Sequence, residues 1–171
     1  MLMGIHVMLA SVVAMAARVV PLPSLPQPAA KTFVAKSGDN FVMHATPINP
    51  DWIIGGEPQA RTGEHSRSND DAAYTAIWDC TAGEFRWHFY WDETVMILEG
   101  GVHIVAEDGT ERTLEAGDVA FFAAGTWACW RVDNYVRKVA FLRKPFPKPV
   151  ALVYRLRSLL RGEAPKSGIA A

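Results

Sequence analysis

The chain has 171 residues, half of them hydrophobic, which is enough for one folded domain with a core but not comfortably for two. Seventeen basic and eighteen acidic residues leave a formal net charge of −1, so the composition argues against a nucleic-acid-binding protein. The two cysteines, Cys80 and Cys129, exclude a disulfide framework and lack the paired spacing of a structural zinc site. We interpret both as buried thiols in a reducing compartment.

The first twenty residues are mostly apolar, but His6 and Arg18 interrupt them, and the run is too short for a typical membrane-spanning helix. Ala14 to Ala16 resembles a signal-peptide cleavage site, yet no Lys or Arg precedes the apolar part as a secretory signal normally requires. We therefore expect a cytoplasmic protein with an N-terminal extension, either helical or reflecting a start codon assigned too early. The alternative is export by a signal peptide. The proline-rich residues 21–28 indicate an extended linker, so residues 1–30 should precede the folded domain.

The central part of the chain, residues 31–148, has the pattern of an all-β domain. Its first part is polar, and we expect residues 49–71 to form a surface arm or lid. From Tyr74 onward, short apolar or alternating runs are separated by turn residues, which is typical of an all-β sandwich or barrel. Asp108-Gly109 is a strong hairpin signal. The expected strands are residues 74–79, 84–90, 94–99, 102–107, 112–115, 118–123, 128–132 and 137–143.

The C-terminal residues 149–171 have a helical pattern instead. Apolar residues fall on one broad stripe, basic residues occupy the remaining surface, and Gly162 stands where a helix cap is expected. The stripe consists of Val150, Leu152, Val153, Leu156, Leu159 and Leu160, and the basic residues are Arg155, Arg157 and Arg161. We expect this short amphipathic helix to pack on the barrel or on a second subunit rather than on a membrane.

Two motifs in the expected order resemble a known family. Gly83 and "EFRW" lead to Glu93, with Gly100 seven residues later, and "GTERTLEAGDVAFFAAGTWACW" follows from Gly109. Together they resemble the cupin superfamily, specifically the small cupins related to the ureidoglycine aminohydrolase cupin domain, over residues 74–142. The resemblance implies a jelly-roll barrel, a double-stranded β-helix whose two sheets enclose a lumen open at one mouth.

In cupins, two histidines two positions apart on one strand share a metal with a glutamate from the next strand. The resemblance places that glutamate at Glu93. In one register the histidine positions fall on Arg86 and His88, and in the other on Trp87 and Phe89. The histidine of the second motif falls on Ala128, which cannot bind a metal.

His88 and Glu93 are therefore the two metal ligands that the resemblance implies, with water, His103 or Cys129 as candidates for the remaining positions. Two protein ligands alone bind a transition metal only weakly. We expect either no cofactor or a weakly held divalent transition metal.

A metal-free polar site is the preferred interpretation. In such a site Arg86 binds an anion through its planar guanidinium group, while Glu93 and His88 exchange protons with the ligand. The alternative is that these three side chains form an ion-pair network at the barrel mouth.

The strand around Arg86 has two different faces. Its aromatic residues at 85, 87 and 89 share one face, while Arg86, His88 and Tyr90 share the other. A lumen lined by the polar face predicts a small charged ligand, and one lined by the apolar face predicts a ligand stacked on tryptophan. We keep Tyr90, Trp91 and Trp130 as candidate ligand-binding residues.

Two functions follow from this reading. The first is a small-molecule-binding cupin with a degenerate metal site that holds a small polar or anionic ligand in the lumen. The alternative is a metal-dependent enzyme of small nitrogenous or carboxylic acid metabolism, similar to ureidoglycine aminohydrolase. The fold alone does not decide between them. A homodimer is expected because jelly rolls have short exposed edges and the C-terminal stripe needs a partner surface.

Overall fold

The computed structural model describes residues 32–37, 40–147, 149–153 and 156. Contacts divide the chain into two units, Met1–Thr32 and Phe33–Ala171, and the strands of the described residues lie in the second. The expected extension, residues 1–30, lies outside the described residues, and so does most of the expected C-terminal helix, of which residues 149–153 and 156 are helical. In the described part of the chain, no helix has the length and hydrophobicity needed to cross a membrane.

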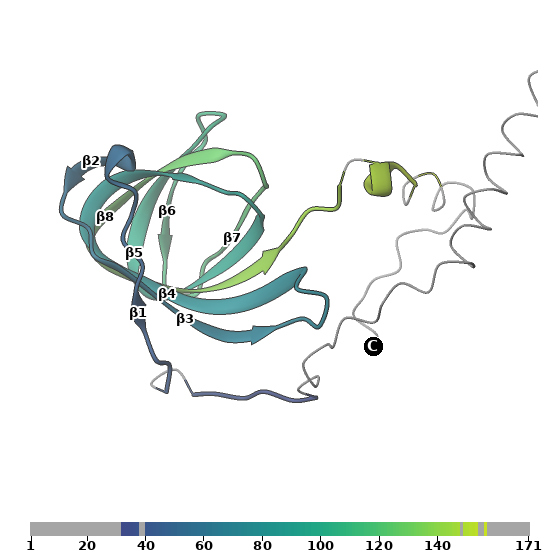
Figure 1. The fold of residues 1–171 in the computed structure, drawn as a ribbon. Coiled ribbons are helices and arrows are strands. Elements are labelled where there is room, and N and C mark those ends of the chain that lie inside the picture. Colours follow the sequence, from purple (N-terminus) through teal and green to yellow (C-terminus); the bar gives the residue numbers. More distant parts are fainter. Residues whose placement is uncertain (1–31, 38–39, 148, 154–155, 157–171) are drawn as a thin grey trace, which may run out of the picture. The chain divides into compact units, whose positions relative to one another are not determined.

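The described strands form one antiparallel sheet that curves into a barrel (Figure 1). Their order in the sheet is β1-β3-β4-β8-β5-β6, with β2 paired to β4 and β7 paired to β5. The elements are β1 (His44–Ala45), the 3₁₀ helix η1 (Pro50–Trp52), β2 (Ile53–Gly56), β3 (Ala60–Arg67), β4 (Ala73–His88), β5 (Asp92–Ala106), β6 (Glu111–Glu115), β7 (Val119–Phe122) and β8 (Trp127–Arg143). The expected all-β class is confirmed.

Three strands are longer than the sequence pattern predicts. β4, β5 and β8 each run through a region where two shorter strands are expected, and each bends at a shift in register instead of turning back. Gly100 shows why β5 can bend. Its φ of +70° suits glycine, and an added Cβ would lie 2.0 Å from the carbonyl oxygen of Tyr135.

The segment expected as a surface arm or lid, residues 49–71, instead supplies η1, β2 and β3, so that prediction is wrong. β3 pairs with β4 along most of its length. Side-chain contacts add to this pairing: Arg61 of β3 donates two hydrogen bonds to Asp79 of β4, at 3.0 and 2.7 Å. A strand held by such contacts lacks the apolar alternation by which strands are recognised in a sequence.

Large side chains fill much of the interior of the barrel. The largest that are completely buried are Trp130, Phe85, Phe89, Ile97, Val95, Val102, Val136 and Cys80. Burial raises the pKa of Cys80 to about 12, with a further contribution from the charge of Asp79. Cys80 is therefore the buried, unreactive thiol that the sequence predicts, whereas Cys129 is only half-buried.

Candidate functional site

Cross-strand pairing shows which side chains face the lumen. Phe85 of β4 is completely buried and lies opposite Trp130 of β8, and in the same sheet Trp78 lies opposite Lys138. Trp130 and Lys138 share one face of β8, because the Lys138 ammonium lies over the Trp130 ring. The apolar face of residues 85–89 is thus the lumenal one, which settles the choice that the sequence left open.

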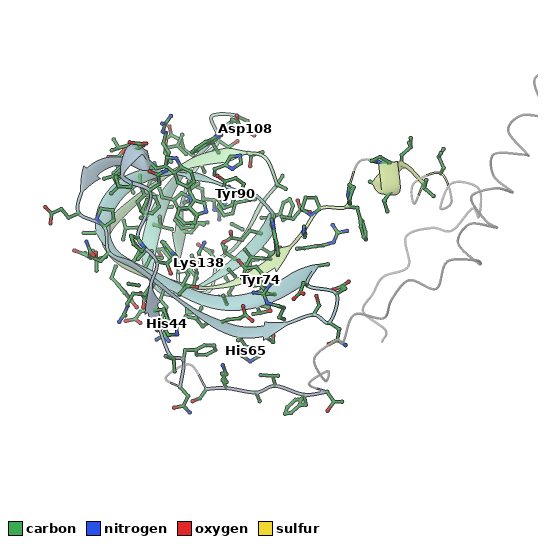
Figure 2. The ribbon with its side chains drawn as sticks, in the orientation of Figure 1. His44, His65, Tyr74, Tyr90, Asp108 and Lys138 are labelled. Carbon is green, nitrogen blue, oxygen red and sulfur yellow. The ribbon has the colours of Figure 1, made fainter. Side chains whose placement is uncertain are left out.

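A lysine and a glutamate meet inside this aromatic lumen. Lys138 Nζ donates a hydrogen bond to Glu93 Oε1 at 2.7 Å, and the two side chains are only 5% and 9% exposed. The ammonium also lies over two indole rings, 4.9 Å from the ring centre of Trp78 and 4.4 Å from that of Trp130. Figure 2 labels Lys138 within the outline of the barrel. An ion pair and two cation–π contacts together compensate part of the cost of burying the ammonium.

The two charged residues start from separate layers of the lumen. Glu93 lies opposite Leu142, whereas Lys138 is four residues earlier on β8 and lies opposite Ile97. Between these layers the inward positions carry small side chains: Ala76 on β4, Ala140 on β8, Val95 on β5 and Ala120 on β7. The small layer leaves space in which two long side chains can reach one another.

The same lumen holds hydrogen-bond donors without acceptors. Among the buried side-chain atoms of the described residues, the indole nitrogens of Trp78 and Trp130 have no hydrogen-bond partner. Buried indole N–H groups normally find an acceptor. Both belong to the rings that contact Lys138. The lumen therefore combines one ammonium and two indole donors with a single carboxylate.

Tyr74 and Trp91 lie at the Glu93 end of the barrel. Burial raises the pKa of Tyr74, and the negative charge of Glu93 raises it further. The ring of Tyr74, labelled in Figure 2, meets that of Trp91 edge-on at 5.3 Å between centres. Trp91 is half-buried, so of the expected pocket residues Trp130 lines the lumen and Trp91 lies near its end.

A cavity of about 360 Å³ lies between β6 and β7. Ile104, Leu114 and Phe122 line it, and all three also belong to the buried core. Phe122 lies opposite Glu93 and contacts the ring of Trp130 at 5.7 Å between centres. Phe122 thus borders this cavity and also contacts a ring that packs on Lys138.

Three of the expected site residues lie on the outer face of β4 and the loop that follows it. Arg86 is exposed and stacks over the ring of Trp127 at 5.5 Å, and Tyr90 is also exposed. His88 packs between Tyr90 and Trp127, at 4.4 and 4.8 Å between ring centres. The expected contact of Glu93 with Arg86 or His88 is wrong, because these side chains alternate with the lumenal ones and Glu93 bonds Lys138 instead.

Lys138 is the site residue that the sequence reasoning missed. In the strand at residues 137–143, Ala140 and Leu142 share the parity of Lys138, while Val139 and Phe141 share the other. Both faces of the strand are therefore apolar in the sequence, and alternation alone does not show that Lys138 points into the core. Its partner was not recognisable, because the partner lies 45 residues away in sequence.

The metal ligands implied by the cupin resemblance do not fit a metal ion here. His88 lies on the outer face, while Glu93 lies in the lumen with an oxygen already bonded to Lys138. Ala128 faces inward where the second-motif histidine is expected, and it supplies no ligand atom. His103 and Cys129 border a small surface pocket. In the part of the chain that the structure describes, no three His, Cys, Asp or Glu side chains come together as a metal site.

Known proteins support the fold. Residues 67–140 match the family described as EutQ-like cupin domain. A protein of unknown function from Pseudomonas syringae pv. tomato, of the DUF861 family, is 26% identical with a TM-score of 0.55. This match covers 59% of this chain and 44% of that one, so the chain spans less than half of the Pseudomonas protein. A predicted oxalate decarboxylase from Thermotoga maritima is 15% identical with a TM-score of 0.50, over 66% of this chain and 99% of that one.

No curated protein matches the sequence of this chain. The barrel has the cupin fold that the sequence resemblance implies. These matches do not single out ureidoglycine aminohydrolase among cupins.

Proposed function

We propose that this cupin domain binds a small polar or anionic molecule in its lumen, at Lys138, Trp78 and Trp130. The observation that carries the proposal is the pair of buried indole N–H groups without acceptors beside a buried ammonium. Leaving a buried donor unpaired costs about 1–3 kcal/mol, so a ligand that supplies acceptor atoms there gains more than it would in water. A carboxylate or another oxygen-rich group meets that requirement.

The surroundings of these donors suit a small ligand. Aromatic rings line ligand pockets in general, with a few polar groups that fix orientation. Here Phe122 and Trp130 supply apolar walls, and we propose the cavity between β6 and β7, which Phe122 also lines, as the route from solvent. The layer of small side chains beside Lys138 leaves room once the ligand separates it from Glu93.

Binding has more support than the metal-dependent enzyme that the resemblance offered as the alternative. That alternative needs His88 and Glu93 on one metal, and the two side chains lie on opposite faces of the barrel wall. A lumenal ion pair with unpaired donors, in contrast, recognises polar groups without a metal.

A panel of small molecules tests the proposal. We expect at least one small carboxylate, oxyanion, amide or amino compound to raise the melting temperature of the wild-type protein and to change its tryptophan fluorescence. Lys138→Met should remove that response, whereas Lys36→Met, which changes an exposed lysine, should keep it. A ligand that stabilises both variants equally would show that binding occurs elsewhere, and the absence of any response would oppose lumenal binding.

The expected homodimer also has a candidate surface. Large apolar side chains are exposed together on the outer face of β5, β7 and β8, opposite the lumen. They are Met96, Leu98, Val119, Phe121 and Phe141. Val119 and Phe121 are 63% and 62% exposed. Apolar side chains on a monomer surface are normally scattered singly, whereas this patch is contiguous and can pair with its own copy across a two-fold axis. We propose that two copies associate through this face.

A further inference from the structure

The charge balance of the lumen restricts the kind of ligand that it can hold. Buried charged residues in the described part of the chain are Asp79, Glu93 and Lys138. Asp79 faces away from the lumen and is neutralised by Arg61. The lumen therefore contains one positive and one negative side chain, joined at 2.7 Å, and its net charge is zero.

Each class of ligand changes this balance differently. A monoanion bound beside Lys138 leaves a net charge of −1 in the lumen, and a divalent metal bound beside Glu93 leaves +2. An uncompensated charge in a buried site is costly, because a low-dielectric interior replaces little of its hydration. A zwitterion leaves the net charge at zero, since it brings one carboxylate and one ammonium together.

The donors and acceptors of the lumen match the two ends of a zwitterion. A ligand carboxylate accepts hydrogen bonds from Lys138 and from the free indole N–H groups of Trp78 and Trp130. A ligand ammonium donates to Glu93, which then exchanges one ammonium partner for another. The aromatic faces that now contact Lys138 are also favourable to a ligand cation.

We propose that the lumen selects a small zwitterion, an amino acid in the general sense of one ammonium and one carboxylate, which replaces the Lys138–Glu93 ion pair by two intermolecular ones. This inference rests on the proposed lumenal binding and narrows it to one ligand class. In the ligand-free lumen, Lys138 is the cation that neutralises Glu93. A metal ion would otherwise have to supply that positive charge.

The test compares small ligands of different charge. Glycine, β-alanine and γ-aminobutyrate are the zwitterions, acetate is the anion, ethylamine is the cation, and zinc chloride supplies the metal. With the wild-type protein, we expect at least one zwitterion to raise the melting temperature and alter tryptophan fluorescence at a concentration where acetate, ethylamine and zinc do not. Acetate binding as tightly as the zwitterions would overturn this inference and leave lumenal binding standing. A panel in which no zwitterion binds would also overturn it.

Two variants change the charge that the lumen prefers. Glu93→Gln leaves the lumen with +1 and should shift the preference to acetate, while Lys138→Met leaves −1 and should shift it to ethylamine. Each should weaken zwitterion binding about tenfold or more, the value of one lost charge-assisted hydrogen bond. Glu64→Gln changes an exposed ion pair with Arg67 and is the matched control, with unchanged preference. Variants that bind the same zwitterion as tightly as wild type would contradict the proposal.

The double variant Lys138→Met with Glu93→Gln keeps the test decisive if one of the single variants does not fold. It carries no lumenal charge, so neither unpaired ion destabilises it, and it should fold yet bind none of the charged probes. Zwitterion binding by this double variant would refute the exchange of ion pairs.

Discussion

Breaking the lumenal ion pair from one side should destabilise the protein strongly. Lys138→Met removes the ammonium but keeps much of the length of the side chain, and it leaves Glu93 in a site where its side chain is 9% exposed. Removing one partner of a buried ion pair typically costs about 3–5 kcal/mol, because the remaining charge is neither hydrated nor compensated. For a domain of this size, such a loss lowers the melting temperature by roughly 10 °C or more.

Glu93→Gln, which removes the other charge of the pair, should lower the free energy of unfolding by less. Glu93→Gln keeps an oxygen that accepts a hydrogen bond from Lys138, and the ammonium retains its contacts with two indole rings. We expect a loss of about 1–3 kcal/mol, the cost of weakening one buried polar contact. The double variant should recover much of the stability lost in Lys138→Met, because both charges are then absent.

Urea unfolding followed by circular dichroism and by tryptophan fluorescence measures these free energies. The exposed pair of Arg67 and Glu64 supplies the control, since Glu64→Gln should change stability by less than about 1 kcal/mol. A loss of unfolding free energy in Lys138→Met no larger than that in Glu64→Gln would contradict this expectation. So would a loss in the double variant equal to the sum of the losses in the two single variants.

Three further predictions concern other parts of the barrel. In thermal unfolding, Gly109→Ala should lower the free energy of unfolding by roughly 1 kcal/mol, and Gly100→Ala should lower it by well over that amount. Both glycines have a positive φ, but of the two only Gly100 would place an added Cβ against backbone, at 2.0 Å. Equal losses would contradict this. At pH 8 a thiol reagent should label Cys129 and spare Cys80, whose pKa is raised to about 12, and mass spectrometry distinguishes them. Labelling of native Cys80 at the rate of Cys129 would show that its site opens. Phe121→Asp should convert the proposed dimer to a monomer, as measured by light scattering. A wild-type protein that is itself a monomer would contradict the proposed dimer.

The sequence predicts the class of fold well because turn residues and apolar alternation are local signals. Strands such as residues 94–99 follow directly from those signals, and the motif around Glu93 places that residue in the lumen of a cupin barrel. β3 escapes the same reasoning because its stability comes from partners on β4, such as the bond of Arg61 to Asp79, and not from its own pattern.

The candidate site was only partly predictable for a similar reason. Alternation along the strand places Arg86 and His88 on one face and Trp87 on the other. Which of these faces lines the lumen depends on how the barrel closes, and this is seen only in the structure, where Phe85 pairs with Trp130. The contact between Glu93 and Lys138 depends on two strands that lie far apart in sequence.

The indole N–H resonances of the tryptophans test the central claim most directly. The chain has six tryptophans, and Trp78→Phe and Trp130→Phe identify the two signals from the lumen in a ¹H–¹⁵N correlation spectrum. When a ligand that raises the melting temperature is titrated in, we expect these two signals to move downfield as their N–H groups gain an acceptor, while that of the outer-face Trp127 stays in place. Movement of the Trp127 signal with the Trp78 and Trp130 signals unchanged would contradict lumenal binding.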